Sequence, residues 1–136
     1  MTNWRSEETR ARAESRERRD SAIHAMLLDG VECSEIGRQM GISEPRARQM
    51  ADALDDRDKL IRRRANLMRQ ITGTDQSKAE WGYDRARVRW MALVGYSDAE
   101  MVAATGVVQR VANYERRRVL ELLGELSETP HPHQTR

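Results

Sequence analysis

The stretch that decides the fold is SEIGRQMGIS, residues 34–43. Ile36 and Met40 lie four residues apart, the spacing that places two apolar side chains on one face of a helix. Gly41 predicts the end of that helix, because glycine readily adopts the left-handed backbone conformation. Ser43 predicts the N-cap of a further helix. The stretch therefore predicts a short helix, a tight turn and a second helix.

The residues on either side extend this pattern to three helices. Upstream, Gly30 predicts the end of a first helix whose apolar stripe is Ile23, Met26 and Leu27. Ser34 is the predicted N-cap of the short middle helix. Downstream, Glu44 and Pro45 fit the first turn of the third helix, whose buried stripe is Ala47, Met50 and Leu54.

The pattern returns when the sequence is shifted by 65 residues. Gly30 then falls on Gly95 and Gly41 on Gly106, and the coinciding apolar or small positions include Met26 with Met91, Ile36 with Met101, Ile42 with Val107 and Ala47 with Ala112. Because glycine is unfavourable inside helices, its return at both places indicates two turns of the same shape. Val102 and Glu115 depart from the pattern of the first copy. The second copy therefore either packs its third helix at a shifted angle or serves as an oligomerisation element.

Composition favours a small helical protein. The chain has 136 residues, of which 38% are hydrophobic, 34% charged and 4% aromatic. Such a core is thin and aliphatic, and the length is far too short for most multidomain enzymes. The single cysteine, Cys33, excludes an internal disulfide and favours a reducing compartment. No apolar run approaches the roughly 18 residues of a membrane span, and the charged N-terminus is unlike a signal peptide. We therefore expect a cytoplasmic protein without membrane contact.

The first copy resembles the helix-turn-helix DNA-binding superfamily. The resemblance rests on Ile36, on Gly37 where two helices cross closely, on Met40, on Gly41 and on Ile42, within a match of about 30 residues. Sigma-factor region four, resolvase-type and small-terminase units are about equally similar. The resemblance implies an all-α fold with two tandem helix-turn-helix units joined by a basic helical connector.

Five segments follow from this interpretation. They are a charged flexible arm (1–20), unit one (21–56), the basic connector (57–80), unit two with a C-terminal helix (81–126) and a disordered tail (127–136). The C-terminal helix carries an apolar stripe that predicts either an intramolecular core or a dimer seam: Val119, Leu122, Leu123 and Leu126. Trp81, Tyr83 and Trp90 are expected in the core of unit two.

A recognition helix places exposed N-terminal side chains against base edges in the major groove. The expected base-reading residues are Glu44, Arg46, Arg48 and Gln49 in unit one, and Gln109, Arg110 and Asn113 in unit two. Arginine can pair with guanine, glutamine with adenine and glutamate with cytosine. The alternative is that these residues form an ordinary solvated helix face in an arginine-rich chain.

The charges are unevenly distributed although the net charge is only +2. Residues 21–56 carry 3 arginines against 7 acids, residues 57–78 carry 7 bases against 2 acids, and residues 84–118 carry 7 bases against 4 acids. Phosphate contacts, which dominate affinity for DNA, are therefore expected mainly outside unit one. The expected phosphate-binding residues are Ser34, Ser43, Arg57, Arg62, Arg63, Arg64, Arg116, Arg117 and Arg118. The alternative for residues 62–64 is that they keep a helix soluble.

The sequence offers little for catalysis. It contains no phosphate-cradling glycine loop, nucleophile elbow or zinc-spaced ligand set. His24 has no obvious carboxylate and nucleophile beside it, and His131 and His133 fall in the expected tail. We therefore expect no enzyme activity, no cofactor and no metal.

The function that fits best is a sequence-specific double-stranded DNA-binding transcriptional regulator of bacterial, phage or mobile-element origin. Repression by occupying promoter DNA is what the resemblance implies. One alternative is a DNA-packaging recognition subunit resembling phage small terminases. Another is a protein-binding module whose acidic unit one contacts RNA polymerase or another regulator. The expected partners are double-stranded DNA, a second copy of the chain and RNA polymerase.

Overall fold

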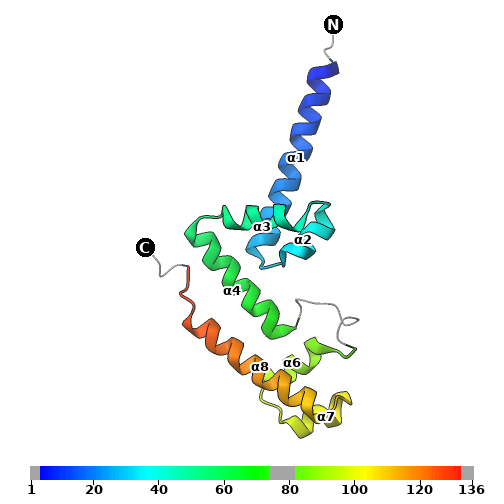
Figure 1. Ribbon diagram of the computed structural model, residues 1–136, viewed down its shortest axis with the longest axis vertical. Coiled ribbons are helices and arrows are strands. Elements are labelled where there is room, and N and C mark those ends of the chain that lie inside the picture. The colour runs from blue at the N-terminus through cyan, green and yellow to red at the C-terminus, as the bar shows by residue number, and fades with distance from the viewer. Residues whose placement is uncertain (1–3, 74–81, 133–136) are drawn as a thin grey trace.

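The computed structural model describes residues 4–73 and 82–132, which contain seven helices and no strand (Figure 1). The all-helical prediction is confirmed for these ranges. The helices are α1 (Trp4–Leu28), α2 (Cys33–Met40), α3 (Glu44–Asp52), α4 (Asp56–Thr72), α6 (Arg85–Leu93), α7 (Asp98–Thr105) and α8 (Gln109–Glu128). Among these helices none is long and apolar enough to cross a membrane.

Helix boundaries recur at the 65-residue spacing seen in the sequence. Helices α2 and α7 have eight residues each and begin 65 residues apart, as do α3 and α8. Gly41 and Gly106 end α2 and α7 in the left-handed conformation, with φ of 67° and 76°. The turns after α1 and α6 likewise contain Gly30 and Gly95, with φ of 78° and 99°. We call α2, α3 and the end of α1 the first trio, and α6, α7 and the first half of α8 the second trio.

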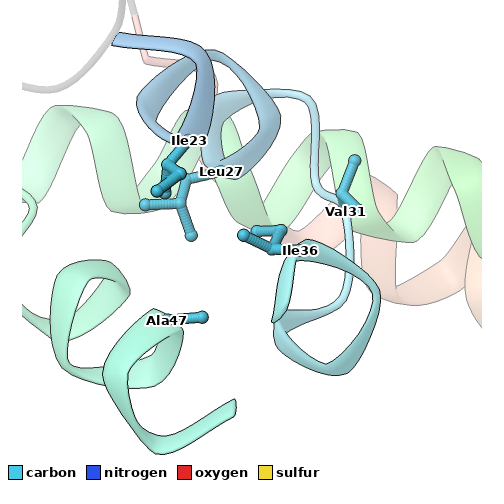
Figure 2. Packing of buried hydrophobic residues seen from close by; sticks show 5 residues of the cluster. All are labelled: Ile23, Leu27, Val31, Ile36 and Ala47. Carbon is cyan, nitrogen blue, oxygen red and sulfur yellow. The ribbon is translucent and has the colours of Figure 1, made fainter. Parts of the chain in front are cut away.

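Each trio has a small apolar core. Figure 2 shows the core of the first trio, where side chains from α1, α2 and α3 point toward one another: Ile23, Leu27, Ile36 and Ala47. Val31, in the turn after α1, lies to one side of them and belongs to the same buried cluster. The core of the second trio contains Val88, Met91, Met101, Val107 and Ala112. Burying a large aliphatic side chain contributes about 1.5–3 kcal/mol, so each core of this size can hold three short helices together.

Helix α4 lies between the two trios and packs against α1, α6 and α8. Its Leu67 and Ile71 form a third apolar cluster with Val119 and Leu122 of α8. Leu123 and Leu126 lie partly buried against that cluster. Of the two interpretations of the C-terminal apolar stripe, the structure therefore supports the intramolecular core.

Both ends of the chain are more regular than the sequence suggested. Residues 4–20, predicted as a flexible arm, form the N-terminal part of α1, which projects from the other helices (Figure 1). Nearly all side chains of residues 6–20 are exposed. The tail predicted to begin at residue 127 is wrong in its first residues, because α8 continues to Glu128 and Thr129 is 5% exposed.

The prediction of an aromatic core in the second trio is wrong for Trp90, which is 56% exposed. Tyr83 is half-buried, and Trp81 lies outside the described residues, as does His133.

Candidate nucleic-acid interface

Helix α3 is held in place by its cap and by a close helix approach. The Oγ atom of Ser43 accepts a hydrogen bond from the backbone N–H of Arg46 at 3.2 Å, which confirms Ser43 as the N-cap. A Cβ atom at Gly37 would lie 2.7 Å from the carbonyl oxygen of Ile42, so α2 can approach the turn only with glycine there. Ala47 is fully buried and anchors the inner face. The opposite face of α3 is therefore presented to solvent in a fixed orientation.

That outer face carries all four residues expected to read bases in the first unit, and each is exposed. Arg48 donates a hydrogen bond to the carboxylate of Glu44 at 2.6 Å, an i, i+4 ion pair on the surface. The side chains of Arg46 and Gln49 form no hydrogen bond or ion pair within the described part of the chain. Arg46 and Gln49 are thus the donors that a ligand can reach without breaking an existing bond.

Ser34 lies in the first turn of α2 and not at its cap. The helix begins one residue earlier, at Cys33, and the residue at the N-cap position, Glu32, makes no side-chain cap bond. The prediction of Ser34 as the cap is therefore wrong. Its exposed side chain instead lines a shallow hollow together with Gly37, Ile42 and Glu44, next to the start of α3.

The second trio offers fewer available donors. Gln109 and Arg110 are exposed at the start of α8. Asn113 and Arg116, however, both donate hydrogen bonds to the carboxylate of Asp98 in α7, at 3.0 and 2.6 Å. These bonds, Arg116 first, hold the pKa of Asp98 below its ordinary value. Asn113 and Arg116 therefore tie α7 to α8 before any ligand arrives.

Two of the three connector arginines have structural partners. Arg62 donates to the carbonyl oxygens of Leu27 and Val31, at 3.0 and 2.9 Å, and so caps the C-terminal end of α1. Arg64 donates to the carbonyl oxygen of Thr129 at 2.8 Å, beyond the end of α8. These guanidinium groups already bind backbone carbonyls, so they are less available to phosphate than fully exposed arginines are, and the phosphate contact of Arg62 and Arg64 stays a prediction.

The remaining predicted phosphate contacts differ in availability. Arg118 forms an ion pair with Glu121 at 3.1 Å, one turn further along α8. The other three are exposed and have no side-chain partner within the described residues: Arg57, Arg63 and Arg117. We call Arg57, Arg63 and Arg117 the exposed arginines.

A buried charge cluster in the second trio was missed by the sequence reasoning. The carboxylate of Glu115 is fully buried and accepts hydrogen bonds from the Nε atoms of Arg89 at 2.6 Å and Arg85 at 3.4 Å. The hydroxyl group of Tyr83 donates to the same carboxylate at 2.6 Å. Burial, together with this bond, raises the pKa of Tyr83 well above its ordinary value. Glu115 stands where the first trio has Met50, so an ionic cluster replaces an apolar contact.

A row of arginines on α1 was also missed. Arg12, Arg16 and Arg19 are spaced by four and three residues, and Ile23 and Leu27 continue the series at intervals of four. This spacing places the three arginines on the helix face that further along packs into the core. All three are exposed, and Arg12 forms an ion pair with Glu8 at 3.0 Å. The signal was present in the sequence as helical periodicity within the alternating charges.

Comparison with protein-family models, with curated proteins and with solved structures finds no match for this chain. Within the part of the chain that the structure describes, no three histidine, cysteine or acidic side chains are grouped so that they could hold a metal ion. The arrangement of α3 and of the neighbouring basic side chains is therefore the basis on which a function can be argued.

Proposed function

We propose that the protein is a sequence-specific double-stranded DNA-binding regulator that works as a transcriptional repressor. The observation that carries the proposal is the outer face of α3, a capped helix on which Arg46 and Gln49 are exposed and have no side-chain partner among residues 4–73 and 82–132. A helix of this size fits the major groove, and arginine and glutamine can each form paired hydrogen bonds with a purine edge.

The recurring helix boundaries support a tandem arrangement of two helix-turn-helix units. The start of α8 corresponds to the start of α3 and carries Gln109 and Arg110 on its surface. Because Asn113 and Arg116 are bound to Asp98, we expect the second unit to contribute less base discrimination than the first. In this proposal the exposed arginines contact phosphates on either side of the bases that α3 reads.

The experiment is selection of bound fragments from random DNA, followed by footprinting of the selected site. Arg46→Ala should relax the preference at one or two base pairs, by about 1–3 kcal/mol per lost contact. Arg18→Ala is the matched control, because it removes an arginine that is also exposed but lies on α1. A footprint and preference unchanged by Arg46→Ala would exclude α3 from base reading.

Salt dependence tests the phosphate contacts separately. Replacing the exposed arginines by glutamine should weaken binding to all sequences and flatten the slope of log affinity against log salt by up to about 2.7. Wild-type protein that binds no DNA even at low salt would refute the proposed function.

The acidic charge of the first unit favours a second candidate, a module that binds a basic protein surface. Residues 21–56 carry a net charge of −4, from 3 arginines and 7 acids, and Asp52, Asp55 and Asp56 are exposed near the end of α3. In the absence of DNA binding at low salt, binding of RNA polymerase that Asp52→Asn and Asp56→Asn weaken would support this candidate.

A further inference from the structure

An apolar surface is left uncovered at the end of α6. Trp90, Leu93 and Val94 lie on one face of that helix at i, i+3 and i+4, and they are 56%, 39% and 53% exposed. Tyr96, in the following turn, is 38% exposed, and its ring centroid lies 6.4 Å from that of Trp90. We call these four residues the α6 patch. Contiguous exposed apolar residues of this kind mark interaction sites more often than isolated ones do.

In the first trio, Ala25 and Asp29 correspond to Trp90 and Val94 and are exposed, whereas the turn that corresponds to Gly95 and Tyr96 is covered by a helix. There the turn after α1 lies directly against α4, so that a Cβ atom at Gly30 would come within 2.3 Å of the backbone nitrogen of Asn66. The side chains of Arg62 and Asn66 donate to carbonyl oxygens of this turn, and Val31 is only 6% exposed. At the equivalent position of the second trio, a Cβ atom at Gly95 would meet nothing within 4 Å.

The difference follows from where the third helix of each trio ends. Helix α3 ends at Asp52, and the chain turns back through α4 to cover the first trio. Helix α8 continues without a break to Glu128, so within the described residues no further helix follows to cover the α6 patch. Helix α4 packs against α6 and α8 elsewhere, but the turn after α6 lacks the cover that α4 gives to the turn after α1.

We propose that a second copy of the chain covers the α6 patch through a two-fold axis, α6 against α6. The patch is itself one face of a helix, so each copy would supply to the turn after α6 of the other the helical cover that α4 supplies to the turn after α1. Two-fold pairing of identical surfaces is the commonest form of homo-oligomer. The patch contains no charged residue, so this pairing brings no like charges together at its centre.

The charges at the two ends of the patch fit this arrangement. Exposed Arg87 lies three residues before Trp90, and exposed Glu100 lies beyond Tyr96 in the first turn of α7. When two helices run antiparallel across a two-fold axis, the beginning of each stripe meets the end of the other. Arg87 of one copy would then lie near Glu100 of the second copy, so opposite charges face one another twice.

The test is the mass of the full chain in solution, measured by light scattering over a range of concentrations. Wild-type protein should have twice the chain mass of 15.7 kDa. Trp90→Ser with Val94→Ser should give the monomer mass with unchanged helical circular dichroism, because both side chains are exposed in the single chain. The matched control is Val108→Ser with Leu120→Ser, which removes apolar residues that are 61% and 56% exposed outside the patch and should leave the dimer intact.

A charge exchange tests the antiparallel orientation. Arg87→Glu should raise the dimer dissociation constant about tenfold or more, and adding Glu100→Arg to it should restore dimerisation. Wild-type protein that is monomeric at about 200 µM would overturn the proposal, because such a pairing would have a lower affinity than a specific protein–protein interface provides. A dimer that survives Trp90→Ser with Val94→Ser would overturn it as well.

Discussion

Removing the charge of Glu115 should destabilise the second trio strongly. Its carboxylate is fully buried and forms ion pairs with Arg89 and Arg85, which are 1% and 8% exposed. Glu115→Gln preserves the shape of the side chain but leaves the buried guanidinium group of Arg89 without the carboxylate that it pairs with. Breaking a buried ion pair on one side costs about 3–5 kcal/mol, which is a large part of the stability of a small protein.

The assay is urea denaturation followed by circular dichroism, with thermal denaturation as a second measurement. For a chain of this size, a loss of 3 kcal/mol lowers the melting temperature by roughly 10 °C or more. Glu121→Gln is the matched control on the same helix, because its ion pair with Arg118 is largely exposed and is worth about 0–1 kcal/mol. Replacing the whole cluster with apolar residues, by Glu115→Met with Arg85→Leu and Arg89→Met, should recover most of the lost stability.

A loss below about 1 kcal/mol for Glu115→Gln would refute this reasoning, since an exposed pair could account for it. Equal losses for Glu115→Gln and Glu121→Gln would do the same, because burial is what distinguishes the two carboxylates.

Three further results are expected. Arg62→Ala should lower the free energy of unfolding, measured in urea, by about 1.5–3 kcal/mol, because it removes the charged hydrogen bonds that cap α1. The control Arg63→Ala should change the same free energy by less than about 0.5 kcal/mol. Equal effects of the two variants would contradict the capping role of Arg62. Gly95→Ala should lower the free energy of unfolding by about 1–2 kcal/mol, because alanine would have to adopt the positive φ of Gly95. Gly30→Ala should lower it by clearly more, because its Cβ atom would also overlap the backbone of α4. Similar losses for the two variants would show that the contact between this turn and α4 is loose. The pKa of Asp98 is lowered in the folded protein, so its contribution to stability is present above its ordinary pKa of 3.8 and is lost as the pH falls through the lowered value. When the urea midpoint of unfolding is measured against pH, Asp98→Asn should therefore lose less stability in acid than the wild type does. Parallel curves for the two proteins would disprove this.

The ends of the helices could be predicted from glycine and N-cap residues, because each of these signals acts on residues that are close in the sequence. Gly41 ends a helix wherever its backbone adopts a positive φ, and Ser43 caps the next one through an amide three residues away. Both effects act within one turn of chain, so the sequence contains all the information they require. The cap of α2 was misplaced by two residues, at Ser34 instead of Glu32, because the helix begins without a side-chain cap bond that the sequence could reveal.

The roles of individual arginines could not be predicted because they depend on distant partners. Arg62 lies 31 residues from Val31 and Arg64 lies 65 residues from Thr129, yet each arginine side chain donates a hydrogen bond to the carbonyl oxygen of its distant partner. A run of three arginines gives no sign of which members turn inward. Glu115 was noticed as a departure from the apolar pattern, but its buried partners on α6 become evident only when α6 and α8 are brought together.

The mutual orientation of the two trios depends on a single rod. Helix α4 has 17 residues and so spans about 25 Å, and it contacts both trios: Arg62 and Asn66 bind the turn after α1, and Leu67 and Ile71 pack against α8. One extra residue inserted at its middle would advance everything beyond it by about 1.5 Å and rotate it by about 100°. The exposed N-terminal ends of α3 and α8 would then point in unrelated directions. The length of α4 therefore sets the distance and the angle between these two ends.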